Sequence, residues 1–301
     1  MGEGVVVAIL PSWQRVGSTA DSVALSSEDE PVPSDAFRAS AMIDVRGLQI
    51  TGSTHAEAPV LATGVSLSVT RGEVIGLIGA AGSGTREIAL AIAGRLPDPA
   101  VITAGSIRVD GQELVGASPR DLKRLYDTTV SVISADAPTG LTAHQTVGRQ
   151  LARTLRRREG LSRPAAARQA LELLETVGLP EPQATSLLFS DQLDPAALLQ
   201  VTLASAVSSH PHLLVLDEPP RPLDGAGDTS ALEHCRGFQQ EFGLSIIVVS
   251  QDLDVLEASC DRVAVVEGGR VVEQGSAAEI VTSRQHPHTR RLLDVAISDD
   301  R

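Results

Sequence analysis

The sequence predicts an α/β fold in which a mixed sheet surrounds a phosphate-binding loop and a helical lobe interrupts the sheet. Three observations predict it. Residues 79–86 read GAAGSGTR, a glycine-rich loop between a short apolar run and a helical pattern. Short apolar segments separated by turns recur on both sides of this loop. Residues 213–218 read LLVLDE, which is typical of a buried parallel strand with its acids at the C-terminal edge, where ligands bind in open α/β sheets.

The remaining elements follow from periodicity along the chain. Short apolar runs bounded by turn residues predict strands at residues 43–50, 65–69, 73–79, 106–110, 129–134, 213–218 and 244–249, and a hairpin at 262–272 about Gly268-Gly269. Apolar residues at helical spacing predict helices from residue 87, over 142–158 and 164–177, and near 230–242 and 253–259. The two helices between 142 and 177 form the predicted helical lobe. Residues 1–40 are rich in Ser, Glu, Asp and Pro without a sustained period, which predicts a disordered acidic tail.

Composition excludes several classes of function. The net charge of −13 argues against a nucleic-acid partner, because no basic face could offset phosphate repulsion. We expect the arginine cluster at residues 153–158 to be the solvated face of a helix. No apolar run approaches the roughly 20 residues of a spanning helix, and the first residues lack a secretion signal, so we expect a cytoplasmic chain. Cys235 and Cys260 lack metal-ligand spacing, and we expect buried free thiols.

The glycine-rich loop keeps the backbone of a P-loop. That motif is a glycine, four residues, a second glycine, then Lys and Ser or Thr, and Gly79 and Gly84 have this spacing. Backbone N–H groups at such a helix N-terminus face an anion, and the helix dipole favours negative charge there. The residues predicted to surround the phosphates are Gly79, Ala80, Ala81, Gly82, Ser83, Gly84, Thr85 and Arg86.

The side chains that should complete the loop are absent. Thr85 stands in the lysine position and carries no charge, and Arg86 stands where a hydroxyl should hold Mg²⁺. A guanidinium offers a metal no acceptor. If Arg86 points inward, repulsion of roughly 4 kcal/mol at about 4 Å suppresses metal binding; otherwise it points to solvent. Because consecutive helical residues point about 100° apart, we do not expect Arg86 to replace the lysine charge.

Two acids end the strand at residues 213–218. Asp217 and Glu218 fit a Walker B pair, in which the aspartate holds Mg²⁺ and the glutamate polarises the attacking water. This is the strongest intact chemical signal in the sequence. It predicts Asp217 as the metal residue and Glu218 as a catalytic residue.

Residues 42–296 resemble a family, the ATP-binding subunits of ABC importers of the oligopeptide, dipeptide and nickel class. The similarity lies in VTRGEVIGLIG at 69–79, LPDP at 96–99, GSIRVDG at 105–111, CDRVAV at 260–265 and HPHTR at 286–290, followed by paired leucines. The resemblance implies a P-loop NTPase, RecA-like core of ABC type with an antiparallel β subdomain. It also implies a catalytic lobe at 41–135 and 204–285, a helical lobe at 136–203 and a C-terminal extension at 286–301.

Such subunits dimerise, with ATP between the P-loop of one and the signature motif of the other. Carried over by position, the signature falls on LDPAA at 193–197, where Asp194 is a good N-cap but adds negative charge at an anion site. The glutamine of the Q-loop falls on Ala135, and the switch histidine falls on Gln251, which cannot carry a proton. Asp224 keeps the acid of the D-loop. Residues 42–69 contain no aromatic side chain to stack on adenine.

The resemblance implies ATP and Mg²⁺ as cofactors, with binding weak or absent here. It also implies a second ATP-binding subunit in a heterodimer, transmembrane permease subunits, and indirectly a substrate-binding protein. We expect a weakly or non-hydrolysing pseudo-ATPase, peripheral on the inner face of the cell membrane. Three alternatives stay open. The first is an active ATPase that energises peptide or nickel uptake through the loop backbone with Asp217 and Glu218, with Gln251 as the second candidate catalytic residue beside Glu218. The others are a stand-alone adaptor built on the same scaffold and a decaying, functionless copy.

Overall fold

The computed structural model describes residues 41–55, 57–134, 141–218, 237, 239, 242–283 and 285–292. Several predictions lie outside these residues: the acidic tail at 1–40, the Q-loop position Ala135, the D-loop position Asp224, most of the helix near 230–242, Cys235, and the chain beyond 292. Cys260 is a buried thiol, as predicted. No helix among the described residues is both long and apolar enough to cross a bilayer.

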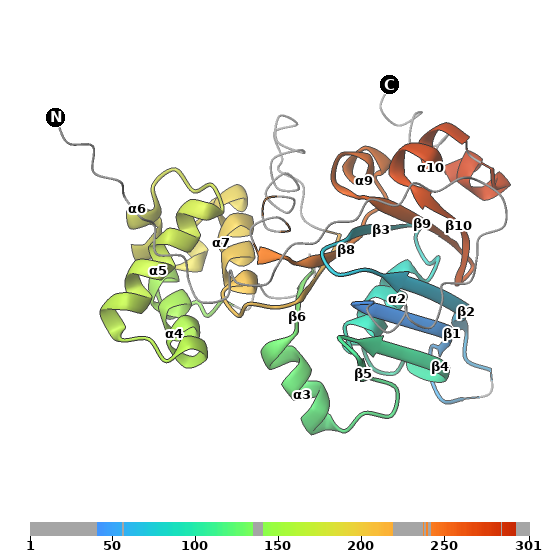
Figure 1. The fold of residues 1–301 in the computed structure, drawn as a ribbon, viewed down its shortest axis with the longest axis horizontal. Helices are drawn as coiled ribbons and strands as arrows, with labels where there is room; N and C mark the ends of the chain where they lie inside the picture. Colours follow the sequence, from blue (N-terminus) through green and yellow to red (C-terminus); the bar gives the residue numbers. More distant parts are fainter. Residues whose placement is uncertain are drawn as a thin grey trace.

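The described residues form two sheets and a set of helices (Figure 1). The strands are β1 (Ile43–Thr51), β2 (Val60–Val69), β3 (Val74–Ile78), β4 (Val101–Val109), β5 (Gln112–Glu113), β6 (Val130–Ser134), β7 (Leu213–Asp217), β8 (Ser245–Val249), β9 (Arg262–Glu267) and β10 (Arg270–Ser276). The helices are α2 (Thr85–Ile92), α3 (Pro119–Thr128), α4 (Val147–Glu159), α5 (Arg163–Thr176), α6 (Pro182–Leu187), α7 (Pro195–Val207), α9 (Leu253–Ser259) and α10 (Ala277–Ser283), with a 3₁₀ turn at Ser190–Gln192.

The larger sheet has the order β10-β9-β3-β8-β7-β6, and only β10 runs antiparallel to its neighbour. Its inner strands are continuous runs of apolar residues because both faces are covered. Side chains alternate between two cores along each strand. In β7, Leu214 and Leu216 enter one core, while Leu213 and Val215 enter the other. This burial fixes the register that brings the C-terminal ends of β6, β7 and β8 to one edge.

The two cores join the other layers to this sheet. The four-stranded antiparallel sheet, of order β2-β1-β4-β5, shares one core with α2 and one face of the larger sheet. Helices α4, α5 and α7 share the other core with the opposite face. In Figure 1 these helices form a lobe at the left, away from α2 and the antiparallel sheet at the right. The mixed α/β fold with a helical lobe is therefore confirmed.

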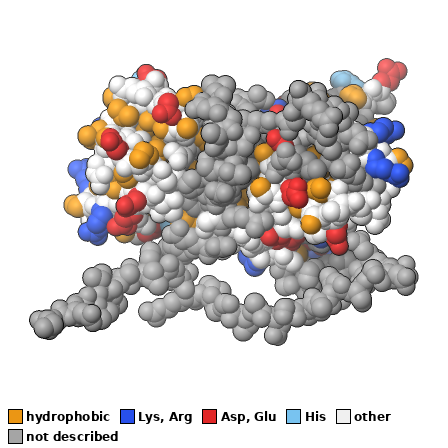
Figure 2. All heavy atoms as spheres, turned by 90° about the horizontal axis from the view of Figure 1, so that it is seen from above, with side chains coloured by type: hydrophobic (Ala, Val, Ile, Leu, Met, Phe, Trp, Pro, Cys, Tyr) orange, Lys and Arg blue, Asp and Glu red, His pale blue; other side chains and the backbone are white. Residues whose placement is uncertain are grey.

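Helix α4 carries the arginine cluster on its outer face. Its buried residues Val147, Leu151 and Leu155 recur every four positions and pack in the core. The side chains of Arg153, Arg156 and Arg157 are exposed. Figure 2 shows basic side chains beside acidic ones at the end of the molecule that holds the helical lobe. The prediction of a solvated helix face is confirmed.

Some predicted boundaries differ from the structure. Strand β2 begins at Val60, five residues before its prediction, and α4 begins at Val147 and not near residue 142. Helices α3, α6 and α10 were not predicted. Helix α3 carries Leu122, Leu125 and Tyr126 on one face, but it is short and its other residues are mostly charged. It begins after Ser118, whose hydroxyl accepts a hydrogen bond from Asp121 N.

Glu273 of β10 holds the start of the C-terminal segment. Its carboxylate accepts hydrogen bonds from Gln285 N at 3.0 Å, from His286 N at 3.0 Å and from the hydroxyl of the fully buried Thr289. Burial raises the pKa of Glu273, but the hydrogen bonds from Thr289, His286 and Gln285 lower it more, so the pKa lies below its usual 4.5. The HPHT segment is therefore anchored by one ionised carboxylate.

This anchor predicts a pH-dependent stability. Because the folded-state pKa of Glu273 is depressed, its contribution is fully present above pH 4.5 and is lost as the pH falls through the folded pKa. The Glu273→Gln variant should have a lower urea midpoint than the wild type at pH 7, and the difference should shrink at acid pH. The matched control is the exposed Glu257→Gln. A Glu273→Gln difference that stays constant down to pH 3 would contradict the assignment.

Candidate functional site

The loop between β3 and α2 has the backbone of a phosphate cradle. Strand β3 ends at Ile78, and α2 begins at Thr85 behind Gly84. Gly82 and Gly84 have φ angles of 76° and 92°, which L side chains rarely adopt. A Cβ atom on Gly84 would lie 2.0 Å from the carbonyl oxygen of Leu61, so only glycine fits there. The strand–loop–helix arrangement predicted from the glycine spacing is therefore present.

The two hydroxyl groups of the loop form a hydrogen bond with each other. Ser83 and Thr85 are 8% and 6% exposed, and their hydroxyl oxygens are hydrogen-bonded to each other. Both lie beneath Gly79, where a Cβ atom would meet Ser83 Oγ at 2.4 Å and Thr85 Oγ1 at 2.7 Å. Thr85 therefore brings neither a charge nor an outward-facing donor to the lysine position.

Arg86 points inward, so the structure decides between the two orientations left open by the sequence. Its Nε atom lies 2.9 Å from Asp217 Oδ2, and its Nη2 atom donates a hydrogen bond to Ser134 Oγ at 3.4 Å. The hydroxyl of Ser134 in turn donates to Asp217 Oδ2 at 2.7 Å. The side chain of Asp217 is 1% exposed and that of Arg86 is 44% exposed. A buried carboxylate is thus compensated by a half-exposed guanidinium.

These residues do not fit a magnesium ion. Mg²⁺ takes oxygen ligands in octahedral geometry, and position 86 offers only nitrogen donors. Asp217 Oδ2 already faces the Arg86 cation, and Asp217 Oδ1 has no hydrogen-bond partner among the described residues. An ion on Oδ1 would lie close to the guanidinium and be repelled. The described part of the chain also holds no group of three or more His, Cys, Asp and Glu residues that could bind a metal.

The two predicted catalytic residues meet at the same sheet edge. Gln251, just beyond β8, donates a hydrogen bond from Nε2 to Glu218 Oε1 at 2.9 Å. Glu218 has a φ angle of 48°, and its backbone N–H donates to Val249 O at 3.0 Å. Both side chains are exposed. A glutamine holds the carboxylate in place but cannot exchange a proton with it.

Asp194 caps a helix in the other lobe. Its Oδ1 atom accepts a hydrogen bond from Ala197 N at 2.8 Å, and Pro195 is the first residue of α7, so the predicted helix start is confirmed. Figure 1 places α7 in the helical lobe, away from α2. Asp194 and the P-loop of the same chain are therefore not brought together.

Ser134 also belongs to this site and was not predicted. This serine is the last residue of β6 and lies opposite Asp217 in the parallel ladder, which places its hydroxyl on the carboxylate. A signal existed, because two parallel strands that end in polar residues bring those residues to one edge. The pairing of these two strands, however, cannot be read from either segment alone.

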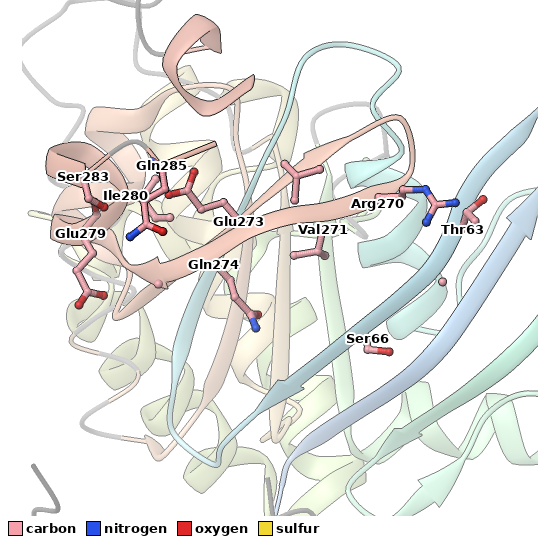
Figure 3. A pocket seen from close by; sticks show the side chains of 13 residues that line it. Thr63, Ser66, Arg270, Val271, Glu273, Gln274, Glu279, Ile280, Ser283 and Gln285 are labelled. Atoms are coloured by element: carbon pink, nitrogen blue, oxygen red, sulfur yellow. Dashed lines mark hydrogen bonds between the residues drawn. The ribbon is translucent and has the colours of Figure 1, made fainter. Parts of the chain in front are cut away.

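A second hollow lies apart from this site. It has a volume of 990 Å³ and lies between β2 and β10, with Arg270 and Thr63 near one end and Glu279 at the other (Figure 3). None of the predicted site residues lines it. The P-loop, Arg86 and the Asp217–Glu218 pair therefore form the candidate site.

Comparisons with known proteins identify the family. The ABC transporter family model matches residues 62–221. The chain is 32% identical over 258 residues to the oligopeptide transport ATP-binding protein OppD of Bacillus subtilis, across 85% of this chain and 72% of that protein. It is 30% identical over 253 residues to the dipeptide transport ATP-binding protein DppD of Haemophilus influenzae, across 84% and 77%.

Solved structures show the same fold. The post-hydrolysis dimer of the ATP-binding cassette MJ0796, bound to ADP and phosphate, superposes with a TM-score of 0.68 at 19% identity, over 78% of this chain and 99% of that one. The cbiO1 structure from Clostridium perfringens gives a TM-score of 0.69 at 20% identity, over 87% and 100%. With the family match, the relatives and the cassette fold in agreement, the chain belongs to the ABC transporter family.

Proposed function

We propose that this chain is the ATP-binding subunit of a peptide-type ABC importer, in which it is a weakly or non-hydrolysing partner of a competent subunit. The transport role is supported by the similarity to OppD and DppD proteins. The impaired hydrolysis is supported by one observation above all: the Arg86 guanidinium lies on Asp217, where a catalytic metal would be bound.

Three further departures from the family's motifs also support impaired hydrolysis. Thr85 supplies no charge to the phosphates, Gln251 cannot relay a proton, and Asp194 would bring a negative charge to a partner's phosphate site. Loss of one group that stabilises developing charge commonly lowers turnover about 10²- to 10³-fold. Catalytic groups that act as a unit lose their effect on the rate when several of them are changed at once. We therefore propose that ATP turnover by this chain alone is negligible.

We propose a different partner for each lobe of the fold. The catalytic lobe, residues 41–135 and 204–285, would face a second ATP-binding subunit in a heterodimer. The helical lobe, residues 136–203, would dock on transmembrane permeases, which would place the chain on the inner face of the cell membrane. A substrate-binding protein would then act on the permeases. In this arrangement the chain has a structural role, because it supplies binding surfaces for the second ATP-binding subunit and for the permeases.

ATP turnover tests this proposal. The purified chain and its Glu218→Gln variant should release phosphate from Mg-ATP at the same background rate, because Glu218 has no catalytic cycle to support. Affinity purification of the chain from detergent-solubilised membranes of its own cells should recover a second ATP-binding subunit and permeases. Turnover by the wild type at least about tenfold above that of Glu218→Gln would sink the non-hydrolysing role. Recovery without membrane proteins would favour a stand-alone adaptor.

One observation favours an active ATPase instead. Glu218 is present next to Asp217, and Gln251 orients its carboxylate through a 2.9 Å hydrogen bond. This arrangement could polarise a water if a metal and a partner's signature motif were supplied. The same comparison of wild type with Glu218→Gln decides between the two functions.

A further inference from the structure

We propose that Arg86 takes the place of the divalent cation, so that the P-loop binds a nucleoside polyphosphate as the metal-free anion. This inference rests on the proposed nucleotide-binding function of the loop. It goes further than impaired hydrolysis, because it assigns the chemical form of the ligand. Arg86, which stands where the P-loop has a Ser or Thr, becomes a residue that determines the specificity of the site.

The geometry places a permanent cation at the metal residue. Arg86 Nε lies 2.9 Å from Asp217 Oδ2, and Ser134 bridges the pair by accepting from Arg86 Nη2 and donating to Asp217 Oδ2. A guanidinium is not deprotonated in proteins, so this charge persists at every working pH. Asp217 is 1% exposed, so its carboxylate lies in a low-dielectric environment, where an opposite charge is needed.

The same contact excludes a second cation. Asp217 Oδ1, which has no hydrogen-bond partner within the described part of the chain, belongs to the carboxylate that Arg86 already neutralises. A divalent ion there would gain little from the carboxylate and would be repelled by the guanidinium. Mg²⁺ also dehydrates reluctantly and needs several oxygen ligands, whereas position 86 has none. The site therefore selects against metal bound to the nucleotide as well as against free metal.

The backbone part of the anion site is kept, although Thr85 supplies no charge. The backbone of the loop is held in its phosphate-cradle shape by Gly82 and Gly84, and α2 points its N-terminus at the cradle. The Arg86 guanidinium offsets the negative charge of Asp217, which would otherwise repel a polyphosphate. A metal-free polyphosphate carries more negative charge than its magnesium complex and brings no cation to meet Arg86. The metal-free form should bind more tightly.

Nucleotide titrations in two metal conditions test this inference. Fluorescent N-methylanthraniloyl-ATP is titrated into the wild-type chain with excess EDTA and with excess Mg²⁺. The wild type should bind about tenfold more tightly with EDTA. Arg86→Ser should reverse this order, because the hydroxyl can hold a metal once the guanidinium is gone. The matched control is Arg168→Ser on α5, an exposed arginine, which should behave as the wild type.

Two further readouts keep the result interpretable. Mn²⁺ electron paramagnetic resonance should show metal bound with nucleotide in Arg86→Ser but not in the wild type, and Arg86→Lys should keep metal excluded. The wild-type comparison stands even if Arg86→Ser unfolds. Binding that Mg²⁺ strengthens in the wild type, or no binding in either condition, would overturn the inference. If a titration overturns this inference while partner subunits are still recovered with the chain, the proposed importer role stands. Failure of this inference is therefore distinguishable from failure of the proposed function.

Discussion

The Thr85→Lys, Arg86→Ser double variant should bind Mg-ATP about 10²- to 10³-fold more tightly than the wild-type chain. A lysine at position 85 adds charge-assisted hydrogen bonds to the phosphates, worth about 1.5–3 kcal/mol. A serine at position 86 supplies a metal ligand and removes the guanidinium that lies 2.9 Å from Asp217. Each 1.4 kcal/mol is a factor of ten in affinity, so the two changes together reach this range. Calorimetric titration of Mg-ATP measures it.

The single variants separate the two contributions. Thr85→Lys alone should gain less than the double variant, because Arg86 still repels the metal. Thermal unfolding must show that each variant is folded, since Thr85 is 6% exposed and its hydrogen bond with Ser83 is lost. An unchanged Mg-ATP affinity in a folded double variant would mean that the loop backbone is not a phosphate site.

Much of this fold could be predicted from sequence because its strands are short apolar runs between turn residues. The predicted strands at 43–50, 73–79, 129–134 and 244–249 each lie within about two residues of the observed ones. The glycine spacing at 79–84 predicted the loop, since positive φ angles and the close approach of Leu61 O leave room for glycine alone. Local signals were sufficient where local sterics decide the structure.

The candidate site was harder to predict, because its central contact is between distant segments. Sequence spacing could name Arg86 and Asp217, which are far apart in the chain, but not their ion pair. That contact depends on β7 lying beside β8 and β6 with its C-terminal end near the start of α2. Ser134 was missed for the same reason. Helix α3 was also missed, although a local signal existed: Leu122, Leu125 and Tyr126 lie at helical spacing behind the Ser118 cap.

Truncating the two members of the Arg86–Asp217 pair should have unequal effects on stability. Arg86→Ala leaves a carboxylate that is 1% exposed and whose one donor among the described residues is the Ser134 hydroxyl, and should lower the free energy of unfolding by about 2 kcal/mol. Asp217→Asn leaves a guanidinium that is 44% exposed and hydrated, and should cost about 1 kcal/mol or less. Urea denaturation at pH 7 without nucleotide measures both.

A variant with both truncations measures the coupling energy between Arg86 and Asp217. Arg86→Ala combined with Asp217→Asn should cost less than the sum of the single variants, because neither side chain leaves an uncompensated charge behind. Added Mg²⁺ should stabilise Arg86→Ala, in which Asp217 lacks a cation, and should leave the wild type unchanged. Additive losses within about 0.5 kcal/mol, with no effect of Mg²⁺ on Arg86→Ala, would mean that the ion pair contributes nothing and that Asp217 does not attract a cation. Coupling together with stabilisation by Mg²⁺ would show that guanidinium and metal compete for one carboxylate.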